Sequence, residues 1–228
     1  MARTWRQLAA RYRRVGPHDV VLVGYFGHLD VLLARLLARL AVRACDLALL
    51  DTPQQIDFAT GALGLPARKL AAVPVGAESE RFPASPPPGG GPMRVLFYGT
   101  FIPLHGAHVL ARAIRQLDGE DIAFTVVGRG QERDAFDREV AVVDGVTVRD
   151  WVPYDRLGEL IAGHDVVLRL FGDTGKAWRV VPGKVYQAAC AGRAIVTSDT
   201  PALRATFDPD EVVLVSPGRS RRPRHRAA

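Results

Sequence analysis

The 228-residue sequence has little of what defines a secreted, zinc-binding or membrane-spanning protein. Its two cysteines, Cys45 and Cys190, are far apart in apolar surroundings, which excludes a disulfide framework or a cysteine-based zinc site. The most apolar stretch, residues 29–50, is interrupted by three arginines, and no signal peptide is recognisable at the start. We therefore expect a cytoplasmic protein with buried thiols and no bound metal.

Lysine is also scarce, because the chain has 3 lysines against 27 arginines, with a net charge of +6. We attribute this bias first to codon composition. Basic residues gather at 3–14 and 219–228, and such clusters can bind nucleic acid or an anionic membrane, although basic ends are usually solvated. Peripheral contact with the inner face of the membrane therefore stays open, whereas nucleic acid is not an expected partner.

The first part of the chain alternates between strand and helix patterns. β-branched and apolar runs near 18–24, 46–52 and 69–76 predict strands, and apolar residues at helical spacing over 29–40 predict a helix. Residues 53–63 predict a second helix. Alternating strands and helices indicate a parallel sheet, but about three strands make only a small one.

A run of proline and glycine follows, and beyond it the alternation becomes regular. Six apolar runs separated by helix-like segments predict a doubly wound, Rossmann-like α/β domain. The expected organisation is a partial first domain, a linker that cannot build a core, a complete Rossmann-like domain and a basic disordered tail: 1–83, 84–92, 93–215 and 216–228.

Ligands of such domains bind where strands end and helices begin, and the segment after the first strand of the second domain has this character. It contains Gly99, Thr100, His105 and Gly106, where backbone amides at a helix start can bind an anion. A plain loop with a surface histidine is the alternative. A second segment carries Gly128 in a Gly-Arg-Gly sequence, but an incomplete fingerprint argues against a dinucleotide.

A third segment, residues 174–193, runs from a basic loop into an alanine-rich helix. Lys184 stands at the predicted helix start, where the helix dipole disfavours a cation unless an anion lies between them. Lys176 and Arg179 add positive charge, and Gln187 lies one turn further on, able to contact a sugar hydroxyl. The pattern therefore predicts a bound phosphate.

Five segments in this order resemble family 4 glycosyltransferases of the GT-B fold: 73–82, 95–114, 124–131, 146–171 and 182–207. The resemblance implies a complete C-terminal Rossmann-like domain that holds a nucleoside diphosphate sugar. It also implies a partial N-terminal Rossmann-like domain on the acceptor side. Sugar transfer in this family is metal-independent and usually retaining, and it uses no cofactor besides the donor substrate.

The resemblance assigns site residues individually. Gly99, Thr100, His105 and Gly106 would face the donor diphosphate, although the family commonly has arginine at the Thr100 position and lysine at the His105 position. The loop that ends at Lys184 would offer amides to the same diphosphate.

The base and sugar contacts follow from the same resemblance. Gly128 and Val152 would border the base. The family's two glutamates, separated by seven residues, align with Arg179 and Gln187, of which Gln187 keeps a ribose contact and Arg179 reverses a charge. We therefore assign Lys176 and Arg179 to the phosphate side.

The sequence also departs from the family. We expect the N-terminal domain to lack its first strands and the C-terminus to lack its closing helices. His28, in the turn after the first predicted strand, is the one candidate catalytic residue, and an exposed turn histidine is the alternative interpretation.

The leading hypothesis is a glycosyltransferase that transfers a hexose or deoxyhexose to an envelope or secondary-metabolite acceptor, whether carbohydrate, lipid or small molecule. The alternative is a truncated, catalytically inactive remnant that binds nucleotide.

Overall fold

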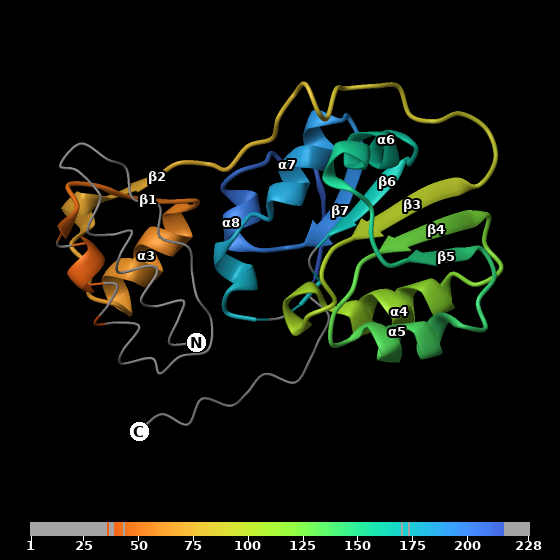
Figure 1. Ribbon diagram of the computed structural model, residues 1–228, viewed down its shortest axis with the longest axis horizontal. Helices are drawn as coiled ribbons and strands as arrows, with labels where there is room; N and C mark the ends of the chain where they lie inside the picture. Colours follow the sequence, from red (N-terminus) through yellow and green to blue (C-terminus); the bar gives the residue numbers. More distant parts are fainter. Residues whose placement is uncertain (1–35, 37–38, 43, 170, 173, 217–228) are drawn as a thin grey trace. The chain divides into compact units, whose positions relative to one another are not determined.

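The structure, a computed structural model, describes residue 36 and the ranges 39–42, 44–169, 171–172 and 174–216. The chain divides into two compact units, Met1–Val73 and Pro74–Ala228 (Figure 1). His28, the first predicted strand and both basic ends lie outside the described residues. The domain boundaries expected from the sequence stay a prediction.

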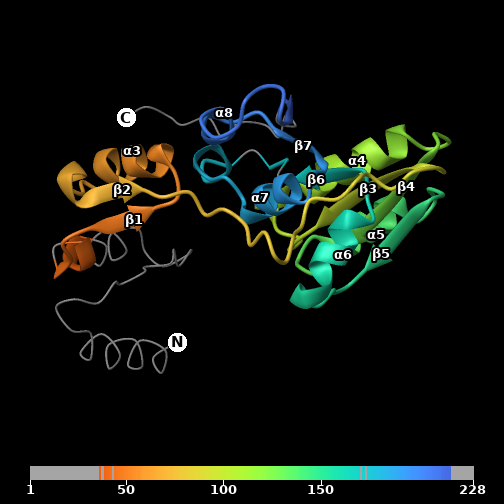
Figure 2. The same ribbon diagram turned by 90° about the horizontal axis from the view of Figure 1, so that it is seen from above.

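The first unit contains a strand, a helix and a strand: β1 (Ala48–Leu50), α3 (Pro53–Gly61) and β2 (Leu70–Ala72). β1 and β2 pair in parallel, and α3 packs against both (Figure 2). The Thr52 hydroxyl accepts a hydrogen bond from the Gln55 amide at 3.2 Å, which caps the helix start. The strand–helix–strand unit predicted from the sequence is confirmed.

The second unit is built on a six-stranded sheet in which every neighbouring pair is parallel. The spatial order is β5-β4-β3-β6-β7-β8, so the chain winds outward in both directions from the centre. The predicted six strands and the doubly wound class are confirmed. β3 and β6 meet where the winding direction reverses, and such switch points are where α/β sheets bind ligands. The strands are β3 (Met93–Tyr98), β4 (Ile122–Val127), β5 (Val146–Arg149), β6 (Val166–Arg169), β7 (Ala194–Ser198) and β8 (Val213–Val215).

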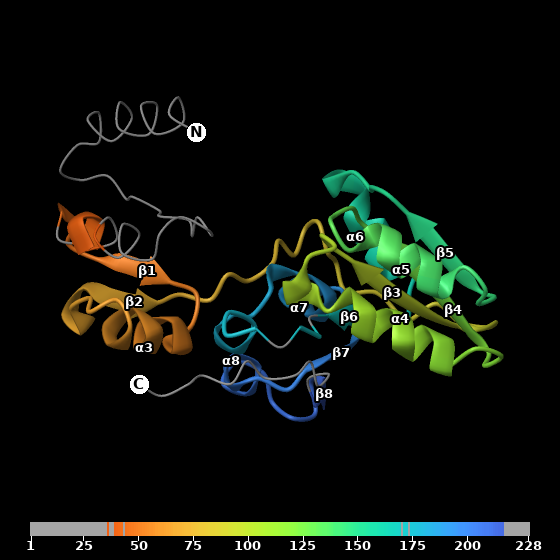
Figure 3. The same ribbon diagram turned by 90° about the horizontal axis from the view of Figure 1, so that it is seen from below.

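Helices cover both faces of this sheet (Figure 3). In β3, Val95 and Phe97 belong to the core formed with α4 and α5, whereas Leu96 and Tyr98 belong to the core formed with α6, α7 and α8. This alternation follows from the two-residue period of a strand. The helices are α4 (Ala107–Gln116), α5 (Arg133–Val140), α6 (Leu157–Ala162), α7 (Gly183–Cys190) and α8 (Pro201–Arg204), with short 3-10 turns η2 (Pro103–His105), η3 (Tyr154–Arg156) and η4 (Ala177–Arg179).

The segment before β3 packs onto this second unit. Phe82 is 1% exposed within the core shared by α6 and α7. The guanidinium of Arg193, itself buried, donates to the backbone oxygen and the hydroxyl of Ser85. These contacts tie Phe82 and the beginning of the expected linker, residues 84–92, to the sheet. The cysteines, expected to be buried, are only partly so.

Candidate anion-binding site at the switch point

The loop after β3 brings three of the expected site residues together at the carboxyl edge of the sheet. Gly99 has a φ of +158°, a conformation that side chains rarely adopt. A Cβ atom on Gly99 would lie 2.8 Å from Lys184 Nζ and 3.2 Å from His105 Nδ1. Glycine therefore lets Lys184 Nζ and the imidazole approach the Gly99 backbone more closely than a Cβ atom would allow.

Two other predicted glycines have a packing reason to be glycine. Gly106 has a φ of +68°, and a Cβ there would lie 2.6 Å from the Phe171 carbonyl carbon. Gly128 has a φ of +150°, and a Cβ there would overlap the Gly99 carbonyl oxygen. Both allow a close approach of backbone segments around the switch point, so packing alone accounts for them.

Lys184 is the second residue of α7, at the helix start that the sequence predicted. Its Nζ donates to the backbone oxygen of Tyr98 at 3.1 Å and lies 5.1 Å from the centre of the Tyr98 ring. Burial, together with the neighbouring charge of Arg169, lowers the pKa of Lys184 to about 7. The first turn of α7 contains no acidic residue, so the helix start and the lysine together form a positive region.

Gln187 lies one turn further along α7 and contacts the end of β3. The buried Tyr98 hydroxyl donates to Gln187 Oε1 at 2.9 Å. Burial raises the pKa of Tyr98 far above its usual value, so the phenol stays a neutral donor. This contact occupies the amide oxygen of Gln187 and leaves its NH₂ group available for a hydroxyl acceptor.

His105 ends η2 and folds back over its own loop. Its Nδ1 hydrogen-bonds to the Thr100 carbonyl, and its ring meets Phe97 edge-on at 6.5 Å. Burial, Arg169 and Lys184 lower the pKa of His105 to about 4, so the imidazole is neutral at pH 7. Because a carbonyl accepts from Nδ1–H, the free Nε2 is an acceptor, and His105 becomes a phosphate donor only when protonated.

Arg169 is the site residue that sequence analysis missed. It is the last residue of β6, is 1% exposed, and donates to the same Tyr98 backbone oxygen as Lys184. The available signal was a single arginine inside an otherwise apolar central strand. The sequence pattern predicts this strand only as part of the sheet.

The remaining predicted residues lie around this centre. Thr100 is exposed, Lys176 directly precedes η4, and Arg179 is the last residue of η4. Val152 is partly buried against the core on the α6 and α7 face. Its side chain therefore contributes to packing.

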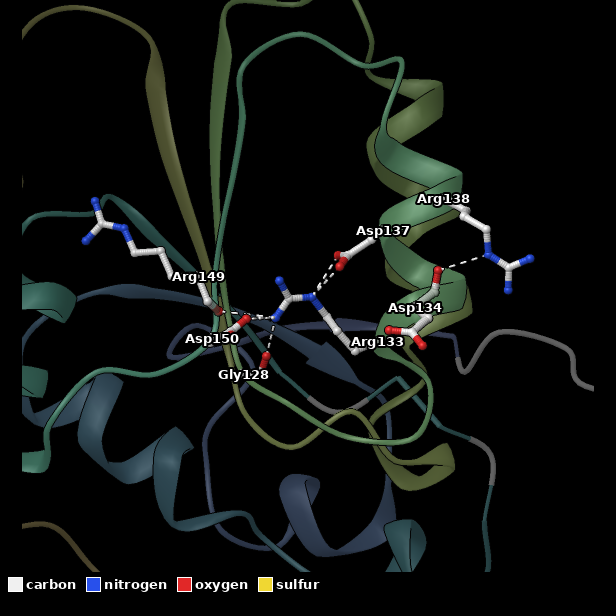
Figure 4. A network of polar contacts seen from close by, with 7 residues as sticks. All are labelled: Gly128, Arg133, Asp134, Asp137, Arg138, Arg149 and Asp150. Atoms are coloured by element: carbon white, nitrogen blue, oxygen red, sulfur yellow. Dashed lines mark hydrogen bonds and ion pairs between the residues drawn. The ribbon is translucent and has the colours of Figure 1, made fainter.

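An arginine at the start of α5 joins the loops that follow β4 and β5 (Figure 4). Arg133 donates to the backbone oxygens of Gly128 and Arg149 and pairs with Asp150 at 3.3 Å. Its Nε also pairs with Asp137, one helical turn away, at 2.7 Å. These contacts fix the two loops that lead to the residues expected to border a base.

Within the residues that the structure describes, no group of three potential ligands is arranged to hold a metal ion. The same residues include no helix that is both long and apolar enough to span a bilayer.

A doubly wound parallel sheet with a glycine turn, a helix start and buried cations at its switch point defines a Rossmann-like domain. The comparison with known families agrees and is more specific. Residues 92–222 match the family described as "Glycosyl transferases group 1", and the chain belongs to this family. The resemblance found in the sequence is thereby confirmed. No curated protein matches the chain.

Solved structures of GT-B glycosyltransferases share its fold. HepE of Anabaena in complex with UDP and glucose is 17% identical, with a TM-score of 0.67 over 84% of this chain and 55% of its own. Sucrose-phosphate synthase of Thermosynechococcus elongatus is 17% identical, with a TM-score of 0.68 over 86% and 51%. The lipopolysaccharide outer core galactosyltransferase WaaB is 19% identical, with a TM-score of 0.58 over 77% and 50%. The chain thus spans about half the length of the structures it matches, and the expected GT-B-like fold class is confirmed.

Proposed function

We propose that this chain binds a nucleoside diphosphate sugar at the carboxyl edge of its six-stranded sheet and transfers the sugar to an acceptor. The observation that carries this proposal is the convergence of Lys184, the start of α7 and the Gly99 turn, where no Cβ separates the cation from the backbone. Family membership and the UDP and glucose named for HepE support it.

The diphosphate would bind beside the Gly99 turn, with the Lys184 side chain turning from the Tyr98 carbonyl toward it. The amides of the first two residues of α7 and the Lys184 ammonium would then meet its oxygens, and an anion at a helix start is favoured by the dipole. The departing nucleoside diphosphate gains negative charge as the sugar leaves. Fixed cations and amides stabilise that charge where it develops, so these groups act in catalysis through electrostatics.

The other contacts are assigned by position. Gln187, with its oxygen held by Tyr98, would donate through its NH₂ group to a ribose hydroxyl. Thr100, His105 and Gly106 would line the diphosphate, with His105 donating only once protonated. Lys176 and Arg179 belong to the same phosphate side, and Gly128 and Val152 to the base side.

The acceptor and the outcome at the anomeric carbon follow from the resemblance to family 4 enzymes. We propose a retaining transfer of a hexose or deoxyhexose to an envelope or secondary-metabolite acceptor. In this proposal residues 93–215 form the donor domain and residues 1–83 lie on the acceptor side, with His28 as candidate catalytic residue. The alternative is nucleotide binding without transfer.

One assay separates these functions. The purified chain is incubated with UDP-, GDP-, dTDP- and ADP-sugars, with and without lipid and sugar acceptors, while release of nucleoside diphosphate is followed. Calorimetry measures binding of each diphosphate in parallel. Acceptor-dependent release supports the transferase. Binding without acceptor-dependent release supports the alternative, and no binding of any diphosphate overturns both.

A further inference from the structure

Arg169 is a charged side chain at a position where the sheet pattern calls for an apolar one. It lies at the end of β6, between β3 and β7, two residues after the fully buried Val167. Both side chains therefore point to the face that α7 covers. Arg169 is itself 1% exposed, and burying a guanidinium is costly unless its charge and N–H groups find partners.

Within the described residues, the surroundings of Arg169 provide only some of the hydrogen-bond partners that its guanidinium needs, and no compensating charge. One terminal nitrogen donates to the Tyr98 backbone oxygen, and the guanidinium carbon lies 5.8 Å and 5.4 Å from the ring centres of Phe97 and Tyr98. Its Nε is buried without a hydrogen-bond partner. Among the ion pairs of the described residues, none joins Arg169 to a carboxylate. The positive charge is therefore uncompensated within this part of the chain.

The same protein shows how a purely structural buried arginine is satisfied. Arg193 is 4% exposed and lies before β7, at the opposite edge of the sheet. Its guanidinium donates to the backbone oxygens of Ala191, His164 and Ser85. All three guanidinium nitrogens of Arg193 thus donate hydrogen bonds to backbone oxygens, whereas only one nitrogen of Arg169 does so in the described part of the chain.

Two other basic side chains, Lys184 and His105, lie near Arg169. Lys184 donates to the same Tyr98 oxygen, so two cations share a single carbonyl acceptor. The charge of Arg169 contributes to the lowered pKa values of both Lys184 and His105. Like charges packed this closely destabilise one another, and a bound anion would relieve the repulsion.

We propose that Arg169 is a positioning residue of the donor site, whose buried charge holds the diphosphate beside Lys184 in addition to bracing β6 against β3. The inference rests on the proposed function and names the pyrophosphate group as what the charge recognises. The protein interior screens electrostatic interactions poorly. The buried Arg169 guanidinium can therefore attract a nearby pyrophosphate without being exposed to solvent itself.

The test measures calorimetric affinities of Arg169→Met, Arg169→Lys and the matched control Arg193→Met. Three ligands are titrated. They are inorganic pyrophosphate, whichever of UDP, GDP, dTDP and ADP binds most tightly, and the nucleoside of that diphosphate. We expect Arg169→Met to bind both phosphate ligands on the order of tenfold or more weakly, with the nucleoside unaffected. Arg169→Lys should retain most of the affinity. Arg193→Met should lower the melting temperature and leave affinity unchanged.

A second readout does not depend on the methionine variant folding. In the wild-type protein labelled with ¹⁵N-arginine, the Nε signal that disappears in Arg169→Lys should shift when pyrophosphate is added. Unchanged affinity in a folded Arg169→Met, an unmoved signal, or an equal loss in Arg193→Met overturns the inference. If Lys184→Ala still loses diphosphate affinity, the proposed function stands without it. Absence of diphosphate binding to the wild type overturns the proposed function as well.

Discussion

The ammonium of Lys184 lies 3.1 Å from the backbone oxygen of Tyr98 and thereby joins the start of α7 to the end of β3. If the donor diphosphate binds at the start of α7 as proposed, a phosphate oxygen would replace this carbonyl as the partner of the ammonium. A neutral carbonyl compensates a cation less well than a charged oxygen does. We therefore expect Lys184 to exchange this partner for the donor diphosphate.

Replacing Lys184 tests this exchange directly. Lys184→Ala should weaken binding of a nucleoside diphosphate by about 1 to 3 kcal/mol, the usual loss for a charge-assisted hydrogen bond. Binding of the nucleoside without phosphates should hardly change, and it serves as the control for local damage. Calorimetric titration of both ligands against both proteins measures the difference. Equal diphosphate affinities would refute the phosphate role of Lys184.

The lowered pKa of Lys184 predicts a pH dependence of binding. With a pKa of about 7, the free lysine is mostly neutral at pH 8, and a bound diphosphate would favour its charged form. Binding at pH 8 should therefore take up protons, approaching one per ligand, and affinity should fall as pH rises above 7. The nucleotide phosphates are already fully ionised there, so they contribute little.

The measurement compares binding enthalpies in buffers of different ionisation enthalpy. Wild-type protein should show proton uptake at pH 8, and Lys184→Met, which has no titratable group at this position, should show almost none. Uptake that persists in Lys184→Met would assign the proton to another group, with His105 the first to examine.

The contact between Tyr98 and Gln187 predicts a ribose-specific effect. Gln187→Ala should lose affinity for a ribonucleoside diphosphate but hardly for its 2′,3′-dideoxy analogue, because only the former has hydroxyls to lose. Tyr98→Phe removes the hydrogen bond that orients the Gln187 amide and should show a smaller loss with the same preference. Equal losses for both nucleotides would place the Gln187 amide away from the ribose.

The fold was largely predictable because its signals are local. The alternation of apolar strands and helix-like segments over 93–215 predicted the six parallel strands, and helix-start chemistry placed Lys184 at the start of α7. Whether a segment forms a strand or begins a helix depends mainly on residues that are close together in the sequence. The contact of Lys184 with Tyr98, 86 residues earlier, is decided by the tertiary structure.

The site was predictable only in part, for the same reason. Arg169 entered the strand prediction as a residue of β6, since a sequence pattern does not show that its neighbours lack a carboxylate. His105 was expected to face the diphosphate, but its neutral state depends on burial and on the charges of Arg169 and Lys184. Burial and charge pairing arise from segments far apart in the chain.

Gly99 offers the sharpest test of where the anion binds. An alanine Cβ at this position would lie 2.8 Å from Lys184 Nζ, beside the site proposed for the diphosphate, and the φ of +158° would strain an alanine. Gly99→Ala should therefore both destabilise the protein and weaken diphosphate binding more than nucleoside binding.

Gly119→Ala is the matched control, because its φ of +84° is strained too while nothing lies within 4 Å of the added Cβ. Its cost should be limited to about 1 to 2 kcal/mol of stability. Thermal unfolding and calorimetric titration of both variants separate the effect of backbone strain from the steric conflict of the added Cβ with Lys184. If Gly99→Ala binds diphosphate as tightly as Gly119→Ala does, the anion lies elsewhere on the sheet edge.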